Sequence, residues 1–284
     1  EQQEQQAQQQ EEPAGRPRGG VFESARPTPS NSLDIQQETA IWEYIPVNYN
    51  KLMKQVKGGL GTDLAQTVPE AVDETTVVAE LIPGVKFHDL KPTDGRELVA
   101  EDVVYSFRRL GTDDPAFQLK RLVAPYESFE ATGTHTVTMK LTEPFSPAIT
   151  LLAHQNMVMV PQEAVEVGGG DLKQGPMNGT GPFMNSVIRH GIVYESIANP
   201  DYFEEGLPYL AGHRHQIIPE RASWFSSFRG GGQDIFPNAN KEERESLTAN
   251  QLEGIGKEIQ VGSRSKITIN TQHDLFTDPR IREA

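Results

Sequence analysis

Cysteine is absent from this chain of 284 residues. Without thiols the protein has no disulfide, no cysteine nucleophile and no thiolate metal site. Long hydrophobic runs are missing too. The longest apolar stretches, residues 148–153 and 157–160, fall far short of the roughly 18 residues that a membrane-spanning helix needs. The sequence therefore predicts no direct membrane span.

Positive charge is also scarce. The chain has 26 Lys and Arg residues against 40 Asp and Glu residues, and its formal net charge is −14 with neutral histidines. Proteins that hold a nucleic-acid backbone do so with clustered Lys and Arg side chains. We therefore expect no nucleic-acid partner. The acidic balance is compatible with an exported protein, but it does not identify a compartment.

The familiar motifs of catalysis and phosphate binding are missing as well. The sequence contains no G-x-S-x-G, no H-E-x-x-H and no G-x-x-x-x-G-K-[ST] motif. The glycine clusters at 168–170 and 230–232 lack the lysine or the spaced glycines of a phosphate loop, and they are typical of turns. The sequence predicts a protein that is not an enzyme, has no catalytic residues and needs no cofactor.

Seven histidines raise the question of a metal. His213 and His215 are two positions apart, so on a strand they would share one face and could chelate zinc or nickel with a third ligand. No nearby Cys or third His completes such a set, so an exposed strand face with two imidazoles is the favoured interpretation, and we predict no metal. His88 beside Asp89 is a candidate catalytic pair, but a turn with a local hydrogen bond is the favoured interpretation.

Hydrophobic periodicity indicates a mixed α and β chain. The clearest helix covers residues 100–110, with acidic residues in its first turn, arginines in its last turn and Gly111 after it. Further helices are expected within 41–56 and over 144–153, 222–229, 241–254 and 280–284. Strands are expected over 77–81, 85–87, 136–141, 192–197, 215–218, 234–236 and 265–271.

Five aromatic residues fall in or near predicted loops, where they could stack on a ligand: Trp42, Tyr44, Tyr49, Phe117 and Tyr126. Packing in the hydrophobic core is the alternative and is favoured for each residue taken alone. Composition, periodicity and aromatic content thus describe a mixed fold without visible catalytic machinery.

Several segments resemble, in order, the family 5 extracellular solute-binding proteins, the peptide- and nickel-binding components of ABC importers. The most specific is residues 83–110, PGVKFHDLKPTDGRELVAEDVVYSFRRL. It is followed by GTGPF at 179–183, NPDYF at 199–203, GQDI at 232–235 and DPRIREA at 278–284. Their order makes chance agreement a poor explanation.

The resemblance implies an α/β fold of the type II periplasmic-binding-protein kind. Its first lobe would combine residues 21–38 and 175–262 in one discontinuous subdomain, with a second subdomain, 39–174, inserted between them. Residues 263–284 would begin a second lobe that is largely missing from this chain. Residues 1–20, rich in Gln and Glu, are predicted to form a disordered leader.

The resemblance also implies a function. Such a protein captures a solute between two lobes that close about a hinge, and delivers it to an ABC transporter permease. It would act as a monomer on the periplasmic or extracellular face of the cytoplasmic membrane. A peptide-like ligand is predicted. A sugar, a metal chelate, or an enzyme or sensor built on the same fold remain the alternatives.

Candidate ligand-binding residues follow from the same resemblance. Thr39, Ala40 and Ile41 would form the first-lobe wall, whose backbone pairs with an extended peptide as an added strand. Phe117 is the candidate aromatic contact, and Asn156 is a candidate polar contact. A role in a surface loop or in the core is the alternative for each of them.

Overall fold

The computed structural model describes residues 18–39 and 44–247. Most of the predicted leader, and the strand and helix predicted over 265–284, lie outside the described residues. Gly19 and Gly20, at the end of the predicted leader, already hydrogen-bond to the backbone: the Gly19 N–H donates to Tyr209 O (2.8 Å), and the Ala211 N–H donates to Gly20 O (2.8 Å).

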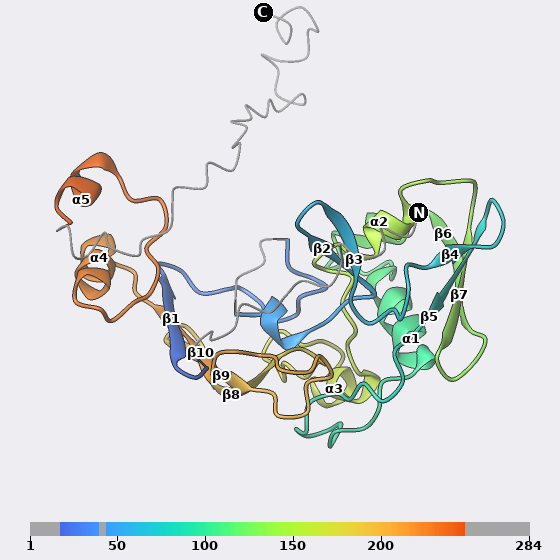
Figure 1. The fold of residues 1–284 in the computed structure, drawn as a ribbon, viewed down its shortest axis with the longest axis horizontal. Coiled ribbons are helices and arrows are strands. Elements are labelled where there is room, and N and C mark those ends of the chain that lie inside the picture. Colours follow the sequence, from blue (N-terminus) through green and yellow to red (C-terminus); the bar gives the residue numbers. More distant parts are fainter. Residues whose placement is uncertain (1–17, 40–43, 248–284) are drawn as a thin grey trace, which may run out of the picture. The chain divides into compact units, whose positions relative to one another are not determined.

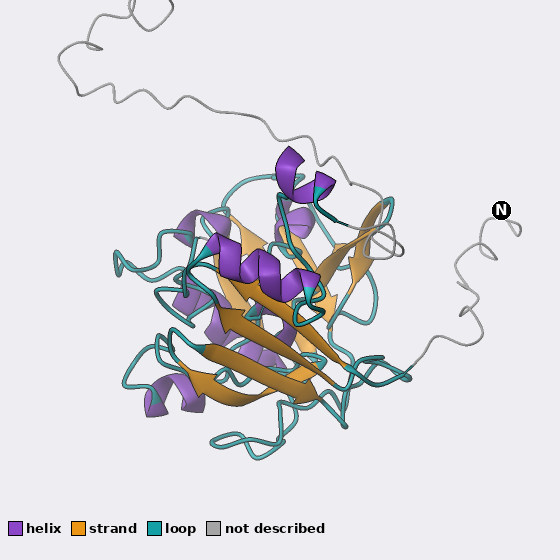
Figure 2. Ribbon diagram, turned by 90° about the vertical axis from the view of Figure 1, so that its left-hand side faces the viewer, coloured by secondary structure: helices purple, strands orange, loops and turns teal. Residues whose placement is uncertain are grey.

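A four-stranded sheet joins the start of the described chain to its later part (Figure 1). Its strands, in the order β1-β10-β9-β8, are β1 (Val21–Arg26), β10 (Gly212–Ile217), β9 (Val193–Ala198) and β8 (Phe183–Arg189). β1 is parallel to β10, and the other pairs are antiparallel. Figure 2 shows this sheet in front. It is therefore assembled from two separate stretches of the chain, and α4 (Arg221–Arg229) follows it.

A second four-stranded sheet comes from one continuous part of the sequence. In the order β4-β5-β7-β6, its antiparallel strands are β4 (Glu70–Ala71), β5 (Thr76–Glu80), β7 (Thr136–Leu141) and β6 (Tyr126–Ala131). On β5 and β7, Val77 and Met139 are paired and buried. The helix α1 (Ala100–Leu110) packs on β6 and β7, and it buries Val103 and Phe107 in the core of this sheet (Figure 1).

A network of three charged side chains, Asp102, Arg96 and Glu163, stabilises the start of α1. The Asp102 carboxylate accepts a hydrogen bond from the Val99 N–H (2.9 Å), which satisfies the backbone donor of the N-cap residue. Arg96 donates to both oxygens of Asp102, at 2.8 and 2.7 Å. Arg96 also binds Glu163 of α3 (Gln162–Val167). The arginine thus ties the two helices together.

Smaller elements complete the described chain. They are η2 (Pro46–Asn48), β2 (Met53–Val56), β3 (Gly59–Thr62), η3 (Lys120–Leu122), α2 (Ala148–Leu151) and α5 (Lys241–Glu245). β2 and β3 pair as a hairpin. The chain divides into two compact units, residues 1–238 and 239–284. Of these elements, α5 belongs to the second unit, where Asn240 caps it by accepting from the Glu243 N–H at 2.8 Å.

Some predicted elements are wrong or shorter than expected. The described part of residues 41–56 holds η2 and β2 in place of a longer helix, because Pro46 starts a single turn and the chain then enters the hairpin. The helix expected over 144–153 is confined to α2, since two prolines, Pro144 and Pro147, precede it. Residues 85–87 and 234–236 are not strands: the first stretch makes a single bridge, Lys86 with Glu97.

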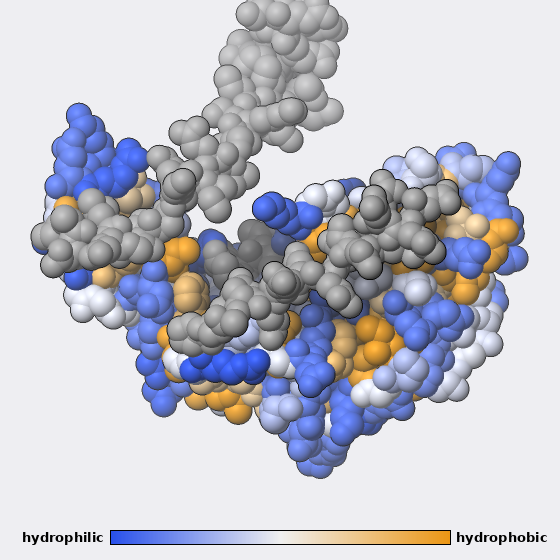
Figure 3. Space-filling view, in the orientation of Figure 1, coloured by the Kyte–Doolittle hydropathy of each residue, from blue (hydrophilic) through white to orange (hydrophobic). Residues whose placement is uncertain are grey.

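Buried aromatic residues occupy the core as the favoured interpretation predicted. Tyr44 and Tyr194 stack with ring centroids 4.2 Å apart, and Tyr49 and Tyr126 are buried as well. Trp42 lies outside the described residues. On the face in Figure 3, hydrophilic residues cover most of the described surface, and hydrophobic ones are exposed in separate patches. None of the described helices is long and apolar enough to cross a lipid bilayer.

Candidate functional site

The predicted ligand wall begins with a tight turn, residues 34–39, which we name the ledge. The Asp34 carbonyl accepts hydrogen bonds from the N–H groups of Gln37 (3.0 Å) and Glu38 (3.1 Å). The Asp34 carboxylate accepts one from the Gln36 N–H at 3.2 Å. An aspartate that bonds its own following backbone in this way favours a turn over a helix or a strand.

On its inner side the ledge is anchored by a buried ion pair. Arg109 of α1 donates Nη1 to Asp34 Oδ1 at 3.1 Å and Nη2 to Asp34 Oδ2, and Nη1 also reaches Gln36 Oε1 at 2.8 Å. The Leu172 N–H donates to Asp34 Oδ2 (3.1 Å), and Gln36 Nε2 donates to Ser106 O (3.0 Å). With side chains 7% and 0% exposed, Arg109 and Asp34 neutralise each other inside the protein.

The side chain of Asn156 binds the backbone of the same turn. Its Nδ2 donates to the carbonyls of Ile35 at 2.6 Å and Glu38 at 2.7 Å. The side chain is fully buried, so the sequence-predicted polar contact lies behind the ledge and not on its surface. Thr39 is exposed at the end of the turn. Ala40 and Ile41, the other two residues predicted for the wall, lie outside the described residues.

Phe117, the candidate aromatic contact, lies in the loop between α1 and η3 and is 5% exposed. The guanidinium of Arg109 sits 4.9 Å from the centre of its ring, a cation–π contact. Arg109 therefore contacts the ledge through Asp34 and Phe117 through its ring. Arg109, which its sequence pattern marks only as a basic residue at a helix end, thus joins Phe117 to the turn that precedes the predicted wall.

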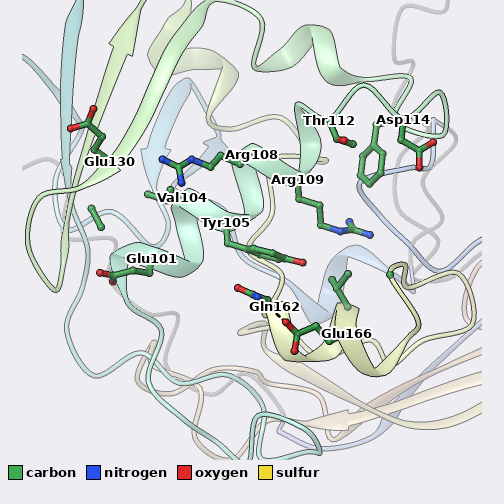
Figure 4. A pocket seen from close by; sticks show the side chains of 14 residues that line it. Glu101, Val104, Tyr105, Arg108, Arg109, Thr112, Asp114, Glu130, Gln162 and Glu166 are labelled. Carbon is green, nitrogen blue, oxygen red and sulfur yellow. Dashed lines mark hydrogen bonds between the residues drawn. The ribbon is translucent and has the colours of Figure 1, made fainter.

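A groove of about 1000 Å³ opens beside Phe117, between α1, α3 and β6 (Figure 4). Tyr105 and Arg109 extend from α1 toward α3, where Gln162 donates to Glu166 at 2.8 Å. The lining residues are Glu101, Val104, Tyr105, Arg108, Arg109, Thr112, Asp114, Phe117, Glu130, Ala131, Gln162, Val165, Glu166 and Gly170. Of the three predicted site residues that the structure describes, Phe117 lines this groove and Thr39 and Asn156 do not.

Burial affects two ionisable groups near the ledge. It raises the pKa of Glu38, and the nearby Asp34 carboxylate adds to this effect. It lowers the pKa of His154, and the charges of Arg121 and Lys51 act in the same direction. Both shifts favour the uncharged form of the side chain.

His88 is a structural residue and does not form a catalytic pair with Asp89. Its Nδ1 accepts a hydrogen bond from the Gly179 N–H at 3.3 Å, so its Nε2 carries the proton and donates to Gly181 O at 3.0 Å. Burial lowers the pKa of His88 to about 4. The neutral ring joins the 83–110 segment to the GTGPF segment, two of the motifs that carry the family resemblance.

His213 and His215 lie side by side on β10, as their spacing predicts. The hydroxyl of Ser24 on β1 is within hydrogen-bond distance of both rings: its Oγ is 2.8 Å from His213 Nε2 and 2.8 Å from His215 Nδ1. In the described part of the chain no group of three or more His, Cys, Asp and Glu side chains is arranged to hold a metal ion. The two imidazoles take part in a hydrogen-bonded contact between β1 and β10.

Comparison with known proteins identifies the family. Residues 59–284 match the model of the bacterial extracellular solute-binding proteins, family 5 Middle. The oligopeptide-binding protein AppA of Bacillus subtilis is 26% identical over 271 residues, which cover 93% of this chain and 47% of AppA. The di/tripeptide-binding protein 2 of Pseudomonas aeruginosa is 29% identical over 240 residues, 78% of this chain and 44% of that protein.

A solved structure shows the same fold. The periplasmic binding protein DppA of Helicobacter pylori, in complex with the peptide STSA, superimposes with a TM-score of 0.77 at 22% identity, covering 94% of this chain and 56% of DppA. The predicted fold, of the type II periplasmic-binding-protein kind, is confirmed. The chain spans about half the length of the curated relatives it matches. It belongs to the bacterial extracellular solute-binding proteins of family 5.

Proposed function

We propose that the whole protein captures a peptide-like solute between two lobes and delivers it to the permease of an ABC transporter. Family membership supports a solute-binding role, and the relatives named for oligopeptides and for di- and tripeptides favour a peptide. The observation that carries the proposal is the ledge: a turn fixed from two sides by Arg109 and Asn156, which ends in the exposed residue Thr39.

The ledge suits an extended peptide for a simple physical reason. Every buried peptide N–H and C=O needs a partner, and a free backbone edge supplies such partners at regular spacing. In this proposal Thr39, Ala40 and Ile41 supply that edge. Because Asp34 is already fixed by Arg109, little conformational entropy would be lost when a ligand binds. Because the ring of Phe117 is buried, Phe117 acts in this proposal through its cation–π contact with Arg109 and not by touching the ligand.

The proposal includes the predicted domain organisation. We propose that residues 21–38 and 175–262 form one subdomain of the first lobe, that 39–174 are inserted in it, and that 263–284 begin the second lobe. Two features support this division: β1 pairs with β10, and all strands of the second sheet lie within the insertion. The protein would act as a monomer on the periplasmic or extracellular face of the cytoplasmic membrane.

A ligand screen on the full-length protein tests the proposal. A ligand that binds the folded state at 100 times its Kd stabilises that state by about 2.7 kcal/mol. We expect di- to nonapeptides to raise the Tm and to remain chemically unchanged. Stabilisation by oligosaccharides or by a nickel–histidine chelate, with none by peptides, would contradict the peptide assignment. Conversion of the peptide into products would instead favour an enzyme on this fold.

A further inference from the structure

Asn156 makes an unusual use of its amide group. A side-chain amide has two N–H donors, and both are spent on the ledge: one on Ile35 O at 2.6 Å and one on Glu38 O at 2.7 Å. These carbonyls lie on either side of the turn. Among the described residues the Oδ1 of Asn156 has no hydrogen-bond partner, although the side chain is fully buried. The hydrogen bonds to Ile35 O and Glu38 O are therefore the contacts that fix the orientation of the Asn156 amide group.

The bond to Glu38 O has a consequence for the next residue. Glu38 C=O and Thr39 N–H belong to one planar peptide group, in which the oxygen and the hydrogen point in opposite directions. Because Asn156 holds the Glu38 oxygen toward the buried side, the Thr39 N–H must point away from Asn156. Thr39 is exposed, and within residues 18–39 and 44–247 its N–H has no protein partner.

We infer that Asn156 is a positioning residue for ligand binding: it turns the Glu38–Thr39 peptide group so that the Thr39 N–H faces a carbonyl oxygen of the ligand. The inference rests on the proposed function. It gives Asn156 a role behind the binding surface in place of the direct contact expected from the sequence. In the same turn Arg109 fixes the side chain of Asp34, and Asn156 fixes the backbone of the residues that follow.

A matched control exists in the same chain. Asn178 is also fully buried, and its Nδ2 also donates to another loop, to Leu90 O at 3.1 Å and to Thr93 Oγ1 at 2.8 Å. Its Oδ1, like that of Asn156, has no partner in the described chain. Asn156→Asp and Asn178→Asp therefore make the same chemical change, at the ledge and away from it. Each places a carboxylate oxygen against atoms that had received a hydrogen bond.

The test uses the full-length protein, with the tetrapeptide Ser-Thr-Ser-Ala as the probe and isothermal titration calorimetry as the measurement. We expect Asn156→Asp to weaken binding by about tenfold or more, and Asn178→Asp to leave it within about twofold. Asn156→Ala, which removes the donors without adding repulsion, should lower the affinity in the same direction if the aspartate variant does not fold.

A second measurement needs no ligand. The ¹⁵N–¹H resonance of Thr39 should move in Asn156→Asp and stay in place in Asn178→Asp. An unchanged Thr39 resonance, or equal affinities of the two aspartate variants, would overturn the inference while leaving the proposed function intact. If the unmutated protein does not bind the peptide, the proposed peptide function fails, and the inference that rests on it fails too.

Discussion

Arg109 and Asp34, 75 positions apart in the chain, form a bidentate ion pair whose side chains are 7% and 0% exposed. Both charged groups also have neutral hydrogen-bond partners inside the protein. Arg109 donates to Gln36 Oε1, and Asp34 accepts from the Leu172 N–H. Such a pair contributes little to stability compared with an apolar pair of the same shape, but breaking it leaves one charge buried and alone. The pair therefore fixes the geometry of the ledge.

Arg109→Met tests this ion pair. The variant leaves the buried Asp34 carboxylate without its positively charged partner, and we expect it to lower the free energy of unfolding by about 3–5 kcal/mol in urea denaturation. Arg108→Met is the control on the same helix, because Arg108 is exposed and its one hydrogen bond within the described residues goes to Phe129 O; it should cost about 1 kcal/mol or less. The double variant Arg109→Met/Asp34→Leu should recover most of the loss. Equal effects of the two single variants would contradict this interpretation.

His88 predicts how stability depends on pH. The pKa of His88 is lowered to about 4 in the folded protein, against 6.5 for an ordinary histidine. Between these values the unfolded chain binds more protons than the folded one, so stability falls as the pH drops from 6.5 toward 4. The full loss from this group is about 3.5 kcal/mol, since the pKa differs by about 2.5 units and each unit is worth about 1.4 kcal/mol.

Comparison with a variant isolates this contribution from those of the carboxylates. His88→Gln should have a lower free energy of unfolding at pH 7 and a shallower decline between pH 6.5 and 5 than the unmutated protein. His190→Gln, at an exposed position, should keep the original slope. A His88→Gln variant with an unchanged slope would show that another group governs this pH range.

The Thr39 backbone can be tested directly by proline. Thr39→Pro removes the N–H that the ledge is proposed to offer, whereas Thr39→Ala keeps it. We expect the proline variant to lose about tenfold or more in affinity for a bound peptide and the alanine variant to stay within about twofold, as measured by calorimetry. Thr39 is exposed, so its side chain contributes little packing. Equal binding by the two variants would exclude a role for this N–H.

The sequence predicted a helix or strand well where periodicity, charge placement and end residues within that segment all indicated the same element. The helix at 100–110 matches α1 in both bounds because its charges, apolar face and terminal glycine agree. β6 was not predicted, since an irregularity between Tyr126 and Ser128 interrupts the alternation that identifies a strand. β3 was missed because Gly59 and Gly61 carry no strand propensity, and its pairing with β2 defines it.

The site was less predictable for a related reason. Arg109 matched the rule that basic residues end a helix, and nothing in its neighbourhood indicated a partner 75 positions away. The same holds for Asn156, whose two acceptors lie in the ledge, on a different part of the chain. Contacts between distant side chains leave no periodic pattern in a sequence. The family resemblance therefore predicted a ligand wall after Asp34, which stays a prediction, and the structure shows the contacts that hold the turn before it.

The glycines of the GTGPF segment lie against another part of the backbone, and this makes a last prediction. A Cβ added to Gly179 would lie 2.1 Å from Asn48 O, and one added to Gly181 would lie 2.4 Å from the Asn48 carbonyl carbon. Backbone atoms cannot move aside as a flexible side chain does, so Gly179→Ala and Gly181→Ala should each cost about 3 kcal/mol or more of unfolding free energy. Gly59→Ala is the control: a Cβ there meets nothing within 4 Å, and the cost should stay within about 1 kcal/mol. Thermal unfolding of the three variants decides the question, and equal Tm values would show that the loop at Asn48 can shift to accommodate the added methyl group.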